Sequence, residues 1–228
     1  MAVSINPSIL SSDLANLGDE VKGIEDACDY LHVDVMDYQF VPNLTFGMPI
    51  VERLLEIVET PIDAHLMIEN PERWAPQYAE AGCKSVTFHY EAAKDPGQVI
   101  AGIRTAGGLV GMGIKPGTRL ETVEELLPHL DMLLVMTVEP GFSGQSFMAD
   151  MLGKVKRARE IIGRDDLKLA IQVDGGVGAK TIEQCADAGA DIFVAGHAVF
   201  RTENPAKACS DLRALAQSAH DKSWWCGG

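Results

Sequence analysis

The sequence predicts an α/β fold, a single (β/α)8 barrel, and three observations point to it. Short apolar runs alternate with amphipathic stretches from one end of the chain to the other. The chain has 228 residues, a length that suits one such barrel. It contains no linker or low-complexity segment. We therefore expect one barrel domain over 1–228, with a loosely ordered tail over 221–228.

The individual elements follow from hydrophobic periodicity. Strand-like runs cover 4–10, 30–35, 62–68, 85–89, 109–114, 131–138, 168–174 and 191–196. Helical periodicity covers 13–27, 48–59, 71–82, 95–107, 146–163, 179–190 and 205–220. We read these as eight β-then-α units, which form either an open doubly wound sheet or a closed barrel. Eight units in so short a chain favour the barrel.

Composition excludes several classes of protein. The formal net charge of -14 argues against nucleic-acid binding, and it means that a phosphate must be held by local geometry. No apolar run reaches the roughly 18 residues of a membrane span, and the start of the chain does not resemble a secretory signal. The five cysteines are scattered without a CxxC pair, which is typical of reduced thiols. We expect a cytoplasmic protein with no membrane partner.

Polar side chains interrupt three of the predicted strands near their carboxyl ends. His32 and Asp34 share one face of their strand, because side chains alternate across a strand. Asp63 and His65 share a face of the next strand, and Asp174 ends the seventh. In a barrel the carboxyl ends of the strands form the mouth where active sites are built.

Imidazole and carboxylate groups at one mouth predict a site for a divalent metal ion, such as zinc, iron(II), manganese or cobalt. The alternative is that both histidines are ordinary core residues and that the aspartates only bind backbone groups. A single histidine at a strand end would be interpreted as an ordinary core residue. Four convergent groups on three strands make the metal site the stronger interpretation.

Three glycine-rich segments follow the last three strands. They cover 139–147, 174–181 and 195–198. Glycine lets backbone N–H groups turn toward an anion, and barrels often hold phosphate in the loops after strands seven and eight. One such loop is weak evidence, because glycine-rich turns are common connectors. Three in successive loops predict a phosphate site that needs no basic surface.

Six segments in order, from Pro7 to about Phe200, together resemble the ribulose-phosphate 3-epimerase family. They read PSILSSDLANL, LHVDVMD with FVPNLTFG, DAHLMIENPE, TFHYEA, VMTVEPGFSGQSF and IQVDGGVGAKT. The resemblance implies a ribulose-phosphate-binding barrel that interconverts D-ribulose 5-phosphate and D-xylulose 5-phosphate in the pentose phosphate pathway. It also implies a homo-oligomer.

The resemblance assigns roles to individual residues. It implies one divalent metal ion held by His32, Asp34, His65 and Asp174, with Asp34 and Asp174 also acting as the catalytic acid and base. Ser8 and His65 would contact the sugar phosphate. The residues implied to bind its phosphate are Gly141, Phe142, Ser143, Gly144, Gly175, Gly176, Val177, Gly196 and His197. An apolar lining near the reacting carbons would come from Met36, Met67 and Met136, which could also be ordinary barrel core.

The chemistry explains these residue types. Epimerisation at C3 of a 2-ketose removes a proton beside a carbonyl and returns one to the opposite face. A single base would tend to return the proton where it came from, so two carboxylates in different protonation states are needed. A metal ion touching the oxygens on C2 and C3 can stabilise the enediolate as a Lewis acid.

The chain departs from the family pattern at two places. Tyr38 and Gln39 stand where family members commonly have glycine and histidine, and His197 stands where serine or another small residue is usual. We expect metal binding to persist despite Tyr38 and Gln39, and phosphate affinity to depend on His197. Asp37 lies beyond its strand, where capping of a loop is the default role.

No catalytic or ligand-binding role is expected for the other titratable residues. His89 and Glu91 match the family but are expected only to support the end of the fourth strand. Lys115 precedes a proline and is expected to be solvated, and His129 and His220 are expected on the surface.

Other functions stay open at this point. A D-allulose-6-phosphate 3-epimerase would use the same chemistry in a roomier pocket. A non-catalytic sugar-phosphate-binding barrel would keep the glycine loops but would not need both Asp34 and Asp174. A lysine-based aldolase or a decarboxylase is possible by fold alone, and the absence of a catalytic lysine pattern at the strand ends argues against both.

Overall fold

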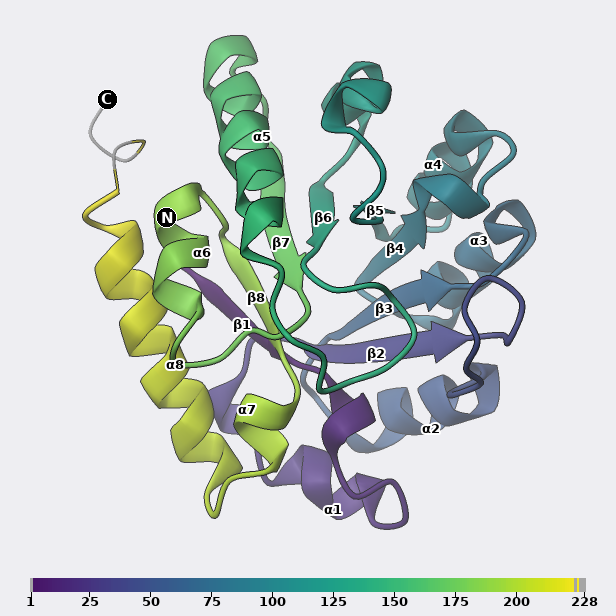
Figure 1. The fold of residues 1–228 in the computed structure, drawn as a ribbon. Coiled ribbons are helices and arrows are strands. Elements are labelled where there is room, and N and C mark those ends of the chain that lie inside the picture. Colours follow the sequence, from purple (N-terminus) through teal and green to yellow (C-terminus); the bar gives the residue numbers. More distant parts are fainter. Residues whose placement is uncertain (1, 224, 226–228) are drawn as a thin grey trace.

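The computed structural model describes residues 2–223 and 225, and Figure 1 shows strands at the centre with helices around them. The predicted tail falls partly on 224 and 226–228, which lie outside the described residues. The (β/α)8 architecture predicted from periodicity is confirmed. The strands are β1 (Ser4–Pro7), β2 (Leu31–Met36), β3 (Ile62–Met67), β4 (Ser85–His89), β5 (Leu109–Ile114), β6 (Met132–Met136), β7 (Ala170–Asp174) and β8 (Ile192–Ala195).

All eight strands are parallel and form one sheet that curls into a nearly closed barrel. The order is β1-β8-β7-β6-β5-β4-β3-β2, so the first and last strands of the chain are neighbours. Ser8, the residue directly after β1, forms an isolated parallel bridge with His32 of β2. This closure brings the start of the chain against β2, where two of the predicted ligands lie.

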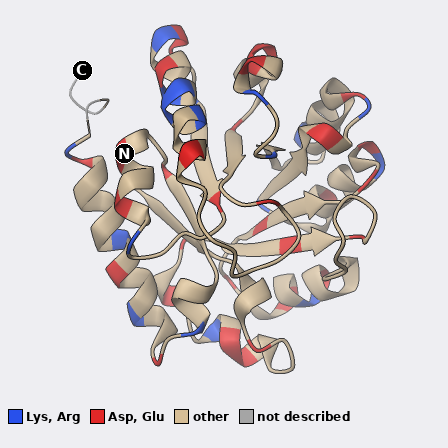
Figure 2. Ribbon diagram, in the orientation of Figure 1, with Lys and Arg blue, Asp and Glu red and all other residues tan. Residues whose placement is uncertain are grey.

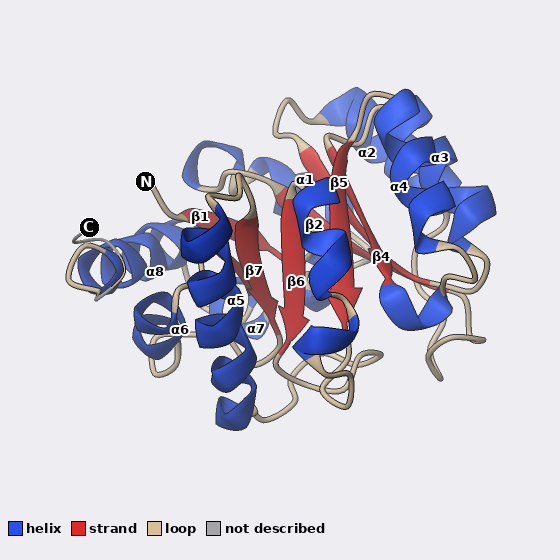
Figure 3. Cartoon of the chain, turned by 90° about the horizontal axis from the view of Figure 1, so that it is seen from above, coloured by secondary structure: helices blue, strands red, loops and turns tan. Residues whose placement is uncertain are grey.

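Helices cover the outside of the barrel, as Figure 3 shows from above. The α-helices are α1 (Leu17–Lys22), α2 (Met48–Ile57), α3 (Pro71–Ala81), α4 (Pro96–Thr105), α5 (Leu152–Asp165), α6 (Ile182–Ala188), α7 (His197–Phe200) and α8 (Pro205–His220). The expectation of an α-helix in every unit is wrong for the described residues between β5 and β6. Short 3-10 helices, η4 (Leu120–Thr122) and η5 (Glu124–His129), stand there. Pro128 lies inside η5 and lacks the N–H that a regular helix needs.

The strands are buried on both faces, which is why they read as nearly continuous apolar runs. The outward side chains of β2, among them Val33 and Val35, join the large core packed against the helices. The inward face carries the polar residues instead. Figure 2 shows the charged residues mainly on helices and loops, with the strands largely uncharged. No helix among residues 2–223 and 225 is long and apolar enough to cross a membrane.

A buried polar cluster lies at the amino-terminal end of the barrel, away from the carboxyl ends of the strands. The buried carboxylate of Asp191 forms an ion pair with Arg159, whose guanidinium also donates to Gly189 O. His220 is 1% exposed, so the expectation of a surface histidine is wrong. Its ring packs edge-on against Trp225, and Arg159 lies over the Trp225 ring. These contacts tie residue 225 to the barrel.

Candidate active site and metal centre

Two histidines and two aspartates meet at the carboxyl end of the barrel. The register pairs His32 with Asp63 and Asp34 with His65 across β2 and β3. Asp174 ends β7 and pairs with Met136 of β6. The alternation of side chains along each strand therefore brings His32, Asp34, His65 and Asp174 to one place, as the spacing predicts.

The geometry of these four side chains fits a divalent metal ion. One donor atom from each lies within 4.8 Å of all the others. Five of their mutual separations lie between 3.1 and 3.8 Å, joining His32 Nε2, Asp34 Oδ1, His65 Nδ1 and Asp174 Oδ2. Ligand atoms about 2.0–2.1 Å from a central ion in a tetrahedron have edges of about 3.3–3.4 Å. The separations and the mixed nitrogen and oxygen donors both match such a site.

Asp63 orients His32. Its Oδ2 lies 2.8 Å from His32 Nδ1, which leaves Nε2 facing the other three donors. The Asp63 carboxylate also accepts from Ser85 Oγ at 2.7 Å and from Gln172 Nε2 at 2.7 Å, and all four residues are buried. Strand alternation correctly predicts the face on which Asp63 lies but gives it no role, because its partner depends on the register between two strands.

His89 has the same relation to His65. His89 is completely buried, and its Nε2 lies 2.9 Å from His65 Nε2. Its Nδ1 lies 3.2 Å from Glu91 Oε2. The expectation that His89 and Glu91 only support a strand end missed this connection. The signal was present in the sequence, since a histidine on the inward face of the neighbouring strand can reach His65.

The two carboxyl groups of the centre have opposite pKa shifts. Burial alone would raise the pKa of Asp34, but the charge of His32 and hydrogen bonds from His32 and His65 lower it below its usual range. Burial, and then the negative charge of Asp34, raise the pKa of Asp174 to about 7. Asp34 is therefore ionised at neutral pH, while Asp174 lies close to its midpoint.

The pKa values of the two histidines, His32 and His65, also shift in opposite directions. Burial would lower the pKa of His32, but the charges of Asp34 and Asp63 raise it well above its usual value. Burial lowers the pKa of His65. In the chain by itself, His32 is thus the protonated partner that balances the surrounding carboxylates.

A cavity of about 700 Å3 opens above the centre. Asp34 and Asp174 line it, whereas His32 and His65 lie beneath, fully buried. Ser8 also lines it and donates from Oγ to Asp34 Oδ2 at 2.5 Å. Its wall further includes all the remaining residues predicted for the phosphate and the apolar lining, Met36, Met67, Met136, Gly141, Phe142, Ser143, Gly144, Gly175, Gly176, Val177, Gly196 and His197.

The glycine loops pack too closely for larger residues. Gly176 has φ +66°, and a Cβ there would lie 2.7 Å from Phe147 N, so the loops after β6 and β7 touch through this glycine. A Cβ on Gly144 would lie 2.8 Å from His197 Cε1. The exposed His197 ring therefore sits against the loop after β6, a contact that the usual serine is too small to make.

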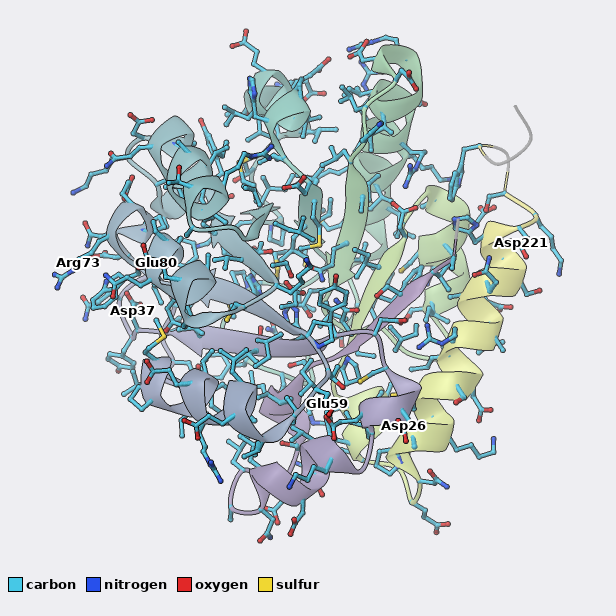
Figure 4. The ribbon with its side chains drawn as sticks, turned by 180° about the vertical axis from the view of Figure 1, so that it is seen from behind. Asp26, Asp37, Glu59, Arg73, Glu80 and Asp221 are labelled. Carbon is cyan, nitrogen blue, oxygen red and sulfur yellow. The ribbon has the colours of Figure 1, made fainter. Side chains whose placement is uncertain are left out.

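The segment after β2 holds the other departures from the family pattern. Tyr38 is 65% exposed and adopts φ +61°, a conformation that suits glycine. Asp37 caps the loop as expected, since its carboxylate accepts from the backbone N–H groups of Gln39, Phe40 and Glu69. Figure 4 shows Asp37 on the side of the barrel near α3, from which Arg73 points outward.

Comparisons with known proteins point to one family. A model of the ribulose-phosphate 3 epimerase family matches residues 4–200. A ribulose-phosphate 3-epimerase of Mycobacterium tuberculosis is 52% identical over 94% of this chain and 93% of its own. Those of Schizosaccharomyces pombe and Bacillus subtilis are 44% and 40% identical, over 97% and 92% of this chain and 97% and 98% of theirs.

Solved structures resemble the chain in fold. KGPDC from Streptococcus mutans superposes with a TM-score of 0.73 at 15% identity, over 96% of this chain and 99% of its own. A 3-hexulose-6-phosphate synthase from Salmonella typhimurium gives 0.70 at 18% identity, over 95% and 100%. Identity this low shows the barrel alone. The family match and the high identity to named epimerases show more: this chain belongs to the ribulose-phosphate 3-epimerase family and is an isomerase.

Proposed function

We propose that this chain interconverts D-ribulose 5-phosphate and D-xylulose 5-phosphate by two-base proton transfer at C3, with one divalent metal ion bound. The observation that carries the proposal is the pair of carboxyl groups, Asp34 and Asp174, at the floor of the cavity with opposite pKa shifts. An epimerase needs one group to accept a proton while another donates one. Both groups must therefore be present in different states before the reaction begins.

Asp34 and Asp174 come from β2 and β7, so they reach the substrate from different strands. In one direction the ionised Asp34 takes the C3 proton, and the protonated Asp174 delivers a proton to the other face. In the reverse direction the roles exchange. Ser8 Oγ donates to Asp34 and holds that carboxylate in place.

His32, Asp34, His65 and Asp174 would hold the metal ion. When bound, such an ion supplies Lewis-acid stabilisation of the negative charge that develops as C3 loses its proton. The buried histidines orient the site from below, so the open side of the cluster faces the cavity.

The phosphate would bind at the far side of the cavity, among the loops after β6, β7 and β8. Gly144, Gly175 and Gly176 have positive φ, which turns backbone N–H groups to directions that a strand or helix does not offer. Backbone donors explain how a chain with a formal net charge of -14 can hold an anion. The methionines that line the cavity would exclude water near the reacting carbon.

The first test is a coupled epimerase assay on D-ribulose 5-phosphate. The enzyme is stripped with chelator and reloaded with zinc, manganese, iron(II) or cobalt, with D-allulose 6-phosphate as comparison substrate. We expect activity to vanish on stripping, to return with metal and to favour the pentose. Preference for D-allulose 6-phosphate would make the hexose phosphate the assigned substrate. Full activity of the stripped enzyme would reject metal dependence.

A second test addresses the two bases. In deuterium oxide, Asp34→Asn and Asp174→Asn should each lose epimerisation but still exchange the C3 hydrogen of one epimer. The two variants should act on opposite epimers, because each keeps a different base. The bound metal is measured in both variants as the control. Exchange of the same epimer by both would contradict the assignment.

A further inference from the structure

A chain of buried hydrogen bonds runs outward from His65, away from the cavity. His65 Nε2 lies 2.9 Å from His89 Nε2, and His89 Nδ1 lies 3.2 Å from Glu91 Oε2. Both histidine rings are completely buried. Two ring nitrogens that face each other at hydrogen-bond distance must share one proton, so the tautomers of the two rings are coupled.

The ionised Glu91 decides between the two possible arrangements. A carboxylate only accepts, so His89 must carry its proton on Nδ1 and donate to Glu91. His89 Nε2 is then an acceptor for a proton on His65 Nε2. The competing acceptor is Asp34 Oδ1, which lies 3.1 Å from His65 Nδ1, and a cation bound at Nδ1 would remove that competition. The reverse arrangement would set a lone pair of His89 against the carboxylate. Burial would raise the pKa of Glu91, but hydrogen bonds from His89 and Thr118 lower it to about 2, so Glu91 is ionised at neutral pH.

The outer end of the chain is anchored to the backbone. The second oxygen of Glu91 accepts from Lys115 N at 2.7 Å and from the Thr118 hydroxyl. The segment KPGT after β5 therefore holds the Glu91 carboxylate in place, and Glu91 in turn orients the ring of His89. Lys115 itself is not simply solvated, because its Nζ lies 3.7 Å from the centre of the Phe40 ring.

The ring of His89 is also confined by packing. Phe40 lies against it with ring centres 5.0 Å apart. On the other strand, a Cβ on Gly113 would lie 3.2 Å from His89 Cε1, so glycine leaves room for the ring there. The position and the tautomer of His89 are thus both determined by its surroundings.

We propose that His89 and Glu91 are positioning residues that favour the Nε2–H tautomer of His65 and so direct Nδ1 toward a divalent cation. The inference rests on the proposed metal centre. His65 Nδ1 is the atom that lies 3.1 Å from Asp34 and 3.3 Å from His32 Nε2. Asp63 acts in the same way on His32, so each histidine of the centre would have its own orienting carboxylate, one direct and one through a second ring.

The test uses the full chain with Zn2+ as the probe. Its affinity is measured by competition with a chelator for the wild type, His89→Phe, His89→Gln and Glu91→Gln. Loss of an outer hydrogen bond to a metal-binding histidine typically weakens metal affinity about 10–100-fold. We expect the larger loss for His89→Phe and about 10-fold for Glu91→Gln. We expect partial rescue in His89→Gln, whose side-chain oxygen can still accept from His65.

A second readout separates positioning from a loss of structure. In the metal-free protein, 15N NMR of the imidazoles reports which ring nitrogen of His65 carries the proton. We expect a larger share of Nε2–H in the wild type than in Glu91→Gln, because Asp34 Oδ1 competes for the proton of His65 from the Nδ1 side. Glu91→Gln changes one polar group on a side chain that is 20% exposed, so it serves even where His89→Phe does not fold.

His220→Phe is the matched control, because His220 is 1% exposed and lies at the other end of the barrel. It should leave zinc affinity unchanged. A wild type that binds no zinc would reject the proposed metal centre. A wild type that binds zinc, with all His89 and Glu91 variants within twofold of it and with an unchanged tautomer, would overturn the inference alone.

Discussion

The two ends of the barrel each hold buried histidine and aspartate, yet they are built for different purposes. At the amino-terminal end, Asp191 meets Arg159, so the negative charge is matched by a cation of the chain itself. At the carboxyl end, Asp34 and Asp174 stand close to His32 and His65. Among the described residues, no arginine or lysine forms an ion pair with those two carboxylates there.

The difference teaches how to separate a structural cluster from a binding site. Residue type is not enough, since both ends use the same types. A carboxylate that is already paired with arginine and backbone groups has little left to offer a ligand. Carboxylates that are balanced only by a histidine proton can exchange that proton for another cation. Four predictions test this contrast, in order of decreasing effect.

The largest effect is expected at Asp34. Asp34→Asn keeps the shape of the side chain but removes the proposed base, so epimerisation should fall about 100- to 10,000-fold. The measurement is kcat with D-ribulose 5-phosphate, with thermal unfolding of the metal-free protein as the control. A loss of stability that accounts for the lost activity would make Asp34 a structural residue like Asp191.

The next effect is expected at Asp191. Asp191→Asn leaves Arg159 buried without its counter-charge, and breaking a buried pair in this way costs about 3–5 kcal/mol of unfolding free energy. Urea unfolding measures the loss, and kcat per folded molecule should stay unchanged. If kcat fell with stability intact, the two ends of the barrel would be functionally coupled.

A smaller effect concerns pH. The pKa of His32 is raised, so in the metal-free protein its proton is present at neutral pH and must leave when a metal ion binds. Zinc affinity should therefore fall about tenfold per pH unit as pH decreases below this raised pKa, and more steeply below about pH 7, where Asp174 is protonated as well. Titration calorimetry in buffers of different ionisation enthalpy counts the protons released. No release at pH 7 would mean that His32 is already neutral.

The smallest effect compares two residues with positive φ, one near each end. Tyr38→Gly should raise the unfolding free energy by about 0.5–1 kcal/mol, because a bulky residue at φ +61° is strained. Asp166→Gly should gain less, because aspartate tolerates its φ of +51°. Denaturant unfolding of both variants gives the comparison. An equal gain in unfolding free energy for both variants would show that Tyr38 is no more strained than Asp166.

The sequence was sufficient for the barrel and for the four groups of the centre. The reason is that period-two alternation and strand ends are local properties, and His32, Asp34, His65 and Asp174 interrupt apolar runs at those ends. Individual elements were less certain. Between β5 and β6 the pattern of eight β-then-α units implied a helix, although no helical periodicity marks that segment, and short 3-10 helices with Pro128 stand there.

What escaped prediction depends on contacts between distant segments. The role of Asp63 follows from the register that sets it opposite His32, and spacing along one strand carries no register. The burial of His220 depends on Trp225 folding back over it near Arg159. The link from His65 through His89 to Glu91 ends at Lys115 and Thr118, in a loop that no motif marked as part of the site.

The order of the strands has a consequence for how this chain acquires its structure. β1 pairs with β8, and Val3 N donates to Gln217 on α8, which follows 214 residues later, so the partners of the first strand are synthesised long after it. A nascent chain emerging from the ribosome would expose the unpaired edge of β1 until β8 arrives. Contacts of such long sequence separation slow folding and prolong exposure to aggregation. Ser8, which donates to Asp34, follows β1 directly, so the proposed catalytic centre would be among the last parts of the molecule to assemble.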